Sequence, residues 1–437
     1  MALLVLLPTF VSAEYRVYFG NLHSHSNLSD GNTDTGPARA FELARDVGRM
    51  DFLSLSEHNH MVTPSGFELL KQEAASHTTN GFVALFGQEF STINTGFNHT
   101  NVQNYDVVIP GSENGKYKHV FGTLIPEWLS AGPGRVVIGE FNHPEKIAID
   151  YGFTADFGGN WDAFVATMDP VVKLIAVSNG PADANKKSFV PDEADRFMHR
   201  EISTGRWFEY LSHGMHLAPK IDHDTHSPTH GFRIDGRTAV WVDGPFTQQS
   251  LLDALSKRHC YATEDRNLSI VPKVNGTHLP GDRLGDVAQL DVSLSISDAD
   301  EPDAQYTARI YQGFTNDTAA PSEVPGTRKE RTGDGSVTLL LTAVPTVRSY
   351  YVVKVEQRSA HPPCGKADDA YLAPIWVSDQ LQDDAIVDSY AFVGSRNSKV
   401  YHYPNCADAL RIRPANIVHY SESPAGMRLH KNCPREP

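Results

Sequence analysis

Residues 16–31 read RVYFGNLHSHSNLSDG, a short apolar run that ends in two histidines and an aspartate. A run of this length is typical of a buried strand, and His23 and His25, two positions apart, would point to the same side of it. The same order, an apolar run followed by residues able to bind metal, recurs before His58, Glu89 and His143, and before Asp224 and His226. Polar residues that follow parallel strands meet at one rim of the sheet, which is how an α/β barrel builds its active site.

Apolar strands alternate with helical stretches from residue 14 to residue 266, which predicts parallel pairing in a barrel or a doubly wound sheet. The polar strand ends favour the barrel. Strands are expected near residues 16–22, 51–55, 82–87, 135–140, 172–177, 217–221 and 237–242.

The hydrophobic pattern of the sequence changes after residue 266. Residues 267–379 contain alternating segments such as QLDVSLSIS and SYYVVKVEQ, separated by turn residues, a pattern typical of an antiparallel β-sandwich. Residues 380–395 are expected to be a polar, acidic linker, and residues 396–437 a small module with two of the four cysteines. The predicted fold is therefore α/β, with a barrel, a β-sandwich and a small third module.

The composition restricts the partners. The chain has 437 residues, with 38 Lys+Arg against 53 Asp+Glu and a formal net charge of -15. This excess of acidic residues disfavours electrostatic binding to nucleic acid or to anionic lipid over an extended surface. Neither a nucleic-acid partner nor a transmembrane segment is expected.

The first thirteen residues, MALLVLLPTFVSA, form an apolar stretch that closes on Val-Ser-Ala. This stretch resembles a secretory signal peptide cut after Ala13, and it is too short to span a bilayer. It contains no Lys or Arg, so a clipped or mis-started reading frame is the alternative. We expect a secreted or periplasmic/extracellular protein.

The residue types at the strand ends indicate a metal site. Imidazoles mixed with carboxylates suit Zn, Mn or Fe, and a carboxylate can bridge two cations about 3.5–4 Å apart. Asp30 follows the first histidine pair on a tight turn with Gly31, and it could close over the same site. For the His-x-His triplet alone, solvated loop residues are the alternative.

The segments LHSHSNLSDG, LSEHN, GQE, NHPE and DHDTHSP together resemble the polymerase and histidinol phosphatase (PHP) family, over residues 15–266. The resemblance implies an irregular seven-stranded β/α barrel that holds two or three divalent metal ions. Glu89 matches the bridging carboxylate, and His99 stands where the family has a further histidine. Glu57 replaces the family's aspartate, which leaves the role of Glu57 open. The implied metal ligands are His23, His25, Asp30, His58, Glu89, His99, His143, Asp224 and His226.

The implied activity is that of a metal-dependent phosphoesterase, in which a metal-bound hydroxide attacks a small phosphorylated substrate. His58, His226 and Asp224 are the predicted catalytic residues, and Arg233 and Arg237 could hold the phosphate. Stretches such as GRTAVWVDG and AYLAPIWVSD look like an exported branch of the family that is related to carbamate-cleaving metallohydrolases. Carbamate or amide hydrolysis at the same site, and a non-catalytic metal-containing binding protein, are the alternatives.

The last forty or so residues predict a second metal site. His402 and Cys406, followed by His430 and Cys433, give the spacing H-x3-C and then H-x2-C. Two such pairs fit a closed tetrahedral site for one zinc ion, and a module this small needs a bound metal or a cross-link for stability. The segment resembles the Ada-like metal-binding domain of DNA alkylation-repair proteins, in which all four ligands are cysteines. A Cys406–Cys433 disulfide, which export would favour, is the alternative.

Overall fold

The computed structural model describes residues 15–91, 99–132, 134–144, 155–180, 202–359, 367–379, 392–395, 398–403, 417–420, 424, 426–431 and 433. The chain divides into two compact units, Met1–Ser378 and Asp379–Pro437. The predicted signal peptide, most of the predicted linker and Cys406 lie outside the described residues.

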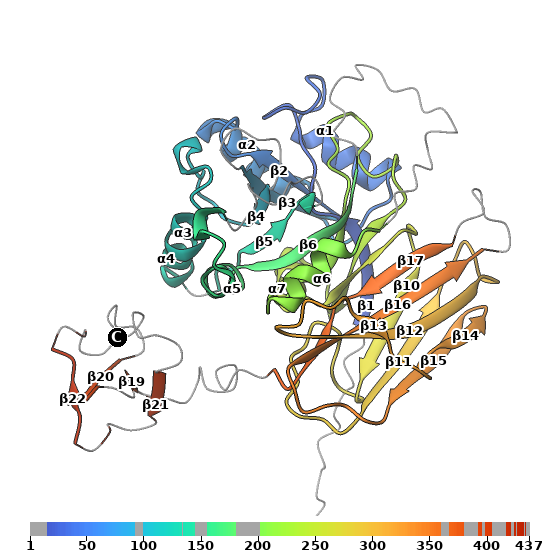
Figure 1. Ribbon diagram of the computed structural model, residues 1–437. Helices are drawn as coiled ribbons and strands as arrows, with labels where there is room; N and C mark the ends of the chain where they lie inside the picture. Colours follow the sequence, from blue (N-terminus) through green and yellow to red (C-terminus); the bar gives the residue numbers. More distant parts are fainter. Residues whose placement is uncertain are drawn as a thin grey trace, which may run out of the picture. The chain divides into compact units, whose positions relative to one another are not determined.

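A mixed sheet of 15 strands runs through the first unit (Figure 1). Its main path has the order β13-β12-β16-β17-β9-β8-β1-β2-β3-β4-β5-β6-β7, with β14 paired to β12 and β18 paired to β16. The strands are β1 (Tyr15–Asn21), β2 (Phe52–His58), β3 (Val83–Phe90), β4 (Thr100–Gln103), β5 (Ile138–Phe141), β6 (Val172–Asn179), β7 (Ala218–Asp222), β8 (Arg237–Asp243), β9 (Cys260–Thr263), β12 (Gln305–Phe314), β13 (Ser322–Glu323), β14 (Lys329–Thr332), β16 (Ser349–Arg358), β17 (Asp368–Leu372) and β18 (Ile375–Val377).

The predicted seven-stranded β/α barrel is wrong, although a strand lies at each expected place. Among the described residues the sheet is open: its path ends at β7 and continues past β8 and β9 on the other side. Two strands also run against the predicted parallel direction: β8 is antiparallel to β1, and β4 is antiparallel to both β3 and β5. Only residues 91–99 separate β3 from β4, fewer than the dozen or so that a parallel crossover needs. The sequence of β4, TNVQ, is polar and gave no strand signal.

A short bridge brings the chain after β7 to the end of β1. Ser24 and Thr225 form an isolated parallel bridge, in which the amide of Asp224 donates to the carbonyl of His23 at 2.9 Å. The amide of His25 donates to the carbonyl of Thr225 at 2.9 Å. This pairing places two of the sequence motifs side by side, although about 200 residues separate them.

Helices and helical turns connect the strands of the first unit. Three of the described helices begin at side-chain caps: Thr63 accepts from the amide of Gly66, Asn160 accepts from the amide of Ala163, and Thr247 forms a capping box with Ser250. The elements are α1 (Pro37–Glu42), η1 (Leu43–Val47), α2 (Pro64–His77), η2 (Gly111–Glu113), α3 (Tyr117–His119), η3 (Val120–Leu124), α4 (Ile125–Ser130), η6 (Ala155–Phe157), α5 (Trp161–Met168), α6 (Gly205–Ser212) and α7 (Gln248–Ser256).

The region predicted as a separate sandwich shares its sheet with the metal-motif region. A three-stranded antiparallel sheet, β10 (Ser269–Val274), β11 (Leu290–Ser297) and β15 (Gly335–Leu341), forms one layer. Burial alternates along β11, and its inward side chains share a core with β12 and β16. Those two strands belong to the large sheet, which β17 joins to β9 through the pair Ala370–Thr263. One antiparallel layer is therefore part of the large sheet, and the other packs against it through a shared core.

The second unit contains a four-stranded sheet. Its order is β21-β19-β20-β22, formed by β19 (Phe392–Ser395), β20 (Val400–His402), β21 (Ile417–Tyr420) and β22 (Arg428–Leu429). Strands this short bury little apolar surface, so such a unit depends on a cross-link or a bound metal for stability.

Candidate metal centre

All nine predicted metal ligands of the first unit lie together. They fall into four overlapping groups, and in each group one ligand atom from every residue lies within 4.8 Å of those of the others. The groups are His25, Asp30, His58 and His226; His23, His25 and Asp224; His23, Glu89 and His143; and His58, Glu89 and His99. We call these residues the nine-residue cluster. Apart from the partly exposed Asp30, all of its members are buried.

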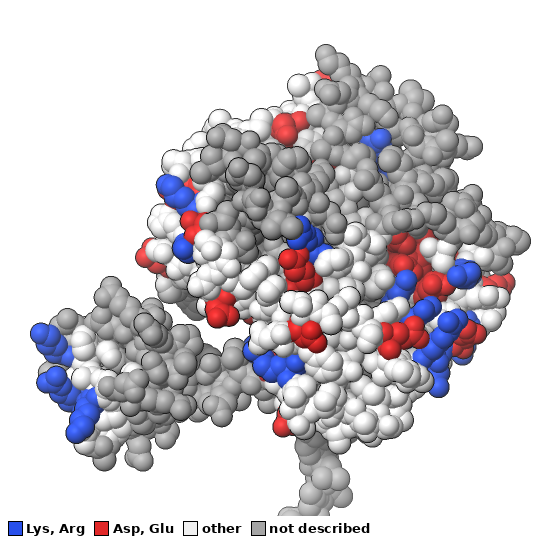
Figure 2. All heavy atoms as spheres, in the orientation of Figure 1, with Lys and Arg blue, Asp and Glu red and all other residues white. Residues whose placement is uncertain are grey.

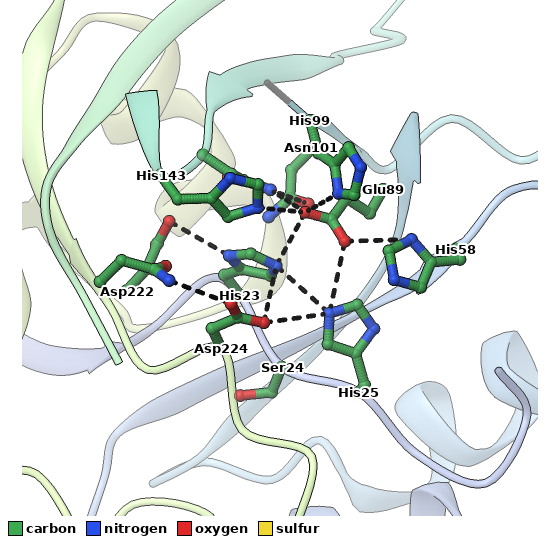
Figure 3. Close-up of polar contacts among 12 residues, drawn as sticks. His23, Ser24, His25, His58, Glu89, His99, Asn101, His143, Asp222 and Asp224 are labelled. Carbon is green, nitrogen blue, oxygen red and sulfur yellow. Dashed lines mark hydrogen bonds and ion pairs between the residues drawn. The ribbon is translucent and has the colours of Figure 1, made fainter. Parts of the chain in front are cut away.

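Glu89 lies at the centre of the cluster, and five histidines surround it (Figure 3). The distances are 3.1 Å from Oε1 to His23 Nε2, 3.1 Å from Oε1 to His99 Nδ1, 3.2 Å from Oε1 to His143 Nε2, 3.4 Å from Oε2 to His25 Nε2 and 3.2 Å from Oε2 to His58 Nδ1. The two carboxylate oxygens thus face two different sets of imidazoles. A carboxylate placed in this way can bridge two cations.

Asp30 and Asp224 supply the remaining carboxylates. Asp30 Oδ1 lies 3.2 Å from His226 Nε2, and its Oδ2 lies 3.3 Å from His58 Nε2. Asp224 Oδ1 lies 3.5 Å from His25 Nε2 and 3.6 Å from His23 Nε2. Each of these carboxylates faces three imidazoles, because Asp30 Oδ1 also lies 3.6 Å from His25 Nδ1 and Asp224 Oδ1 lies 3.5 Å from His226 Nδ1.

Two members of the cluster have unusual backbone conformations. His143 has φ of 31° and Asp224 has φ of 49°, both in the left-handed region that residues with a Cβ rarely adopt. Such strain persists only where the surroundings hold it, and it concentrates at functional sites. Both of these side chains contribute a ligand atom to the cluster.

Hydrogen bonds set the tautomers of two histidines for metal binding. His23 Nδ1 lies 3.3 Å from Asp222 Oδ2, and His226 Nδ1 lies 2.9 Å from the carbonyl oxygen of Asp224. Both partners are acceptors, so each Nδ1 carries the proton and each Nε2 presents a lone pair to the cluster. His23 Nε2 and His25 Nε2 face each other at 3.2 Å, as two ligands of one cation would. The donor set therefore fits divalent cations.

The charges of the cluster also favour cations. Burial alone would raise the pKa of Glu89, but His99 and His23 hold it well below its ordinary range. Burial and the neighbouring His226 lower the pKa of His25 to about 3. Burial alone would lower the pKa of His226, but its hydrogen bond with Asp30 raises it to about 9. A cation must displace that proton, so metal affinity should fall as the pH falls.

Glu57 holds the loop that carries Asp30. Its Oε1 accepts from the amide of Ser26 at 3.0 Å and from the hydroxyl of Ser26 at 2.6 Å, and its Oε2 accepts from the hydroxyl of Ser29. The carboxylate is fully buried, and burial raises its pKa. The Glu57 side chain thus supports the loop from which Asp30 reaches the cluster.

Sequence reasoning missed a set of buried polar residues beneath the cluster. Lys220 and Asp222 on β7 are fully buried, and so are Glu140, Asn142 and Asn101. A signal was present, because a lysine within the apolar run HLAPKI is unusual in a buried strand, and its partner two positions later shares its face.

No known family model matches this chain, and no curated protein sequence matches it either. The resemblances to the PHP family and to the Ada-like domain therefore stay predictions.

Arg237, predicted to hold phosphate, is engaged by the main chain. Its guanidinium donates to four carbonyl groups between residues 231 and 236, at 2.6 to 3.0 Å. It also lines a cavity of about 520 Å³ together with Arg49 and Arg266, and none of the nine cluster residues is among the described residues that line this cavity. Arg233 is buried. Phosphate binding by Arg233 and Arg237 stays a prediction.

Three of the four predicted zinc ligands of the second unit are described, and they lie together. Ligand atoms of His402, His430 and Cys433 fall within 4.8 Å of one another, with Cys433 Sγ 3.5 Å from His402 Nδ1. Cys433 is disulfide-bonded. A disulfide sulfur is no thiolate, so Cys433 can bind zinc only after reduction.

The charge distribution of the surface and the character of the helices bear on nucleic-acid and membrane binding. On the face of the first unit drawn in Figure 2, acidic and basic side chains are interspersed rather than separated by sign. Across the described residues, the helices lack the length and apolar character needed to cross a bilayer.

Proposed function

We propose that this protein is a metal-dependent phosphoesterase that hydrolyses a small phosphomonoester or phosphodiester. The observation that carries the proposal is the position of Glu89, whose two oxygens face separate sets of histidines within one buried cluster. Two cations held side by side, when bound, would lower the pKa of a water molecule and hold the oxygens of a phosphoryl group.

The protein residues have separate tasks in this proposal. His23, His99 and His143 would hold one cation against Oε1 of Glu89, the oxygen that their ring nitrogens face. His25 and Asp224 form a group with His23 and would bind a cation beside it. His58 has one ring nitrogen toward Oε2 of Glu89 and the other toward Asp30, so it would belong to a second position on the Oε2 side.

His226 and Asp30 would complete the second position. Their side chains meet at 3.2 Å, and Asp30 is the one carboxylate of the cluster with substantial exposure, 37% of its side chain. A substrate would therefore approach on the side of Asp30. The predicted catalytic residues His58, Asp224 and His226 act in this scheme by positioning the cations.

We further propose two or three cations of Zn, Mn or Fe in the cluster, in keeping with its mixed imidazole and carboxylate donors. The second unit would take one zinc ion only in its reduced state, since Cys433 is disulfide-bonded. A disulfide is typical of oxidising compartments, which supports the proposal that the protein is secreted or periplasmic/extracellular.

Elemental analysis of the purified chain, together with assays on p-nitrophenyl phosphate, bis-p-nitrophenyl phosphate and a p-nitrophenyl carbamate, tests the function. Phosphoesterase action predicts at least two metals per chain and phosphate-ester turnover that a chelator abolishes. The variant Asp224→Asn should lose both. Turnover of the carbamate alone would replace the proposal with carbamate hydrolysis, and metal without turnover of any ester would indicate a binding protein.

A further inference from the structure

A buried lysine lies beneath the nine-residue cluster and contacts three acceptors. Lys220 Nζ lies 2.8 Å from Glu140 Oε2, 2.8 Å from Asp222 Oδ2 and 2.9 Å from Asn142 Oδ1. An ammonium group has three donors, so these contacts use all of them. Lys220 and its two carboxylate partners are 0% exposed, and a charge buried this deeply persists only when it is paired and hydrogen-bonded.

One branch of contacts leads from Lys220 to His23. Oδ2 of Asp222 receives both the lysine ammonium and Nδ1 of His23. The carboxylate, fixed on one side by Lys220, fixes the imidazole on the other side in the tautomer that turns the lone pair of Nε2 toward Glu89. Carboxylates behind metal-binding histidines orient the ring in this way and raise its basicity.

A second branch leads from Lys220 to Glu89. The side-chain amide of Asn142 accepts from Lys220 through Oδ1 and donates through Nδ2 to Glu89 Oε1, at 2.9 Å. The same Nδ2 donates to Asn101 Oδ1 at 2.7 Å. Because an ammonium can only donate, the amide oxygen must face Lys220, and the amide NH₂ must then face Glu89. Lys220 thereby decides which end of Asn142 supports the central carboxylate.

We propose that Lys220 is a positioning residue of the metal centre, which orients His23 through Asp222 and Glu89 through Asn142. The two branches end on the two ligands that meet at 3.1 Å. One side chain thus determines the geometry of the cation position between them. The inference rests on the proposed function only for the presence of cations, and it is independent of the bond that the protein cleaves.

The variant Lys220→Met tests the proposal, because methionine has a similar length and no charge. We expect a loss of about 10- to 100-fold in affinity for Mn or Zn, the range seen when a supporting contact of a metal ligand is removed. The affinity is measured by competition with a chromophoric chelator. The melting temperature, measured with the metal and with a chelator, gives a second readout: the rise in melting temperature that the metal produces should shrink.

Lys354→Met is the matched control. Lys354 lies on β16 and pairs with Asp369 at 2.6 Å, and neither residue belongs to the cluster or to the two branches. This variant should lower the melting temperature equally with and without metal and should keep the metal affinity of the wild type. A Lys220→Met protein that behaves like this control would overturn the proposal, because Lys220 would then be only a structural ion-pair partner.

Asn142→Asp keeps the test decisive if Lys220→Met does not fold. It keeps the acceptor for Lys220 and removes the donor to Glu89, so metal affinity should fall while the ammonium stays paired. Unchanged affinity would refute the second branch. Wild-type protein that takes up no metal would refute both the proposed function and this inference, whereas metal uptake without hydrolysis would refute the proposed function alone.

Discussion

The nine-residue cluster of the first unit and the three-residue group of the second unit are built on different supports. The cluster takes its members from the ends of several strands, and buried partners such as Asp222 and Asn142 hold them from behind. His402, His430 and Cys433 lie at or near strands of two and three residues, and Cys433 is disulfide-bonded. In the first unit the candidate ligands are held by buried partners, whereas in the second unit one candidate ligand is itself part of a covalent cross-link.

Loss of the central carboxylate should have the largest effect. Glu89→Gln removes the charge that faces five histidines, so we expect a loss of metal affinity greater than about 100-fold, beyond that of a supporting contact. Hydrolysis should fall with it. Elemental analysis and ester turnover measure both effects, and the surface variant Glu330→Gln should change neither. Full metal content in Glu89→Gln would show that Glu89 is not a ligand.

Loss of the disulfide should destabilise the second unit and leave the first unit unchanged. Cys433→Ser removes a disulfide, which typically contributes about 2–4 kcal/mol of stability, so the second unit should unfold at a lower temperature. Metal content and turnover of the first unit should stay at the wild-type level. Calorimetry of the full chain with and without reductant measures the change, and an unchanged melting profile would contradict it.

The hydrogen bonds of Glu57, which hold the loop that carries Asp30, should contribute less to metal affinity than Glu89 does. Glu57→Ala removes the acceptors for Ser26 and Ser29, so the loop loses its anchor and metal affinity should fall by about 10-fold. Glu57→Gln keeps one oxygen for Ser26 and should remain closer to the wild type. Equal affinity in all three proteins would show that the loop is held in another way.

The smallest expected effect is a pH dependence of stability away from the cluster. Burial raises the pKa of Glu264 to about 8, above its ordinary value of 4.5. The folded state therefore favours the protonated form, and this contribution is fully present below pH 4.5 and is lost as the pH rises to about 8. Glu264→Gln should flatten the decline in the free energy of unfolding between these values. Denaturant titrations at several pH values, with chelator present throughout, measure it; an unaltered slope would contradict the assignment.

The sequence allowed the cluster to be predicted better than the fold. Seven of the nine candidate ligands follow a local apolar run, which can be recognised without knowing how strands pair; Asp30 was predicted from a tight turn and His99 from the PHP resemblance. The predicted barrel was wrong because an apolar run does not indicate the direction of its strand, and β8 and β4 are antiparallel to their neighbours. In addition, β4 is polar and was not predicted as a strand. The supporting residues were missed because their role depends on contacts such as Lys220 with Asn142, which lie 78 residues apart.

The burial of the cluster has a consequence for the supply of metal. Seven of its nine members are no more than 6% exposed, and the Ser24–Thr225 bridge joins chain segments about 200 residues apart. Cations bound there would cross-link these segments and leave slowly, because release requires local opening. The metal found in the mature protein would then record the ion pool of the compartment where the chain folded, rather than that of the place where it acts.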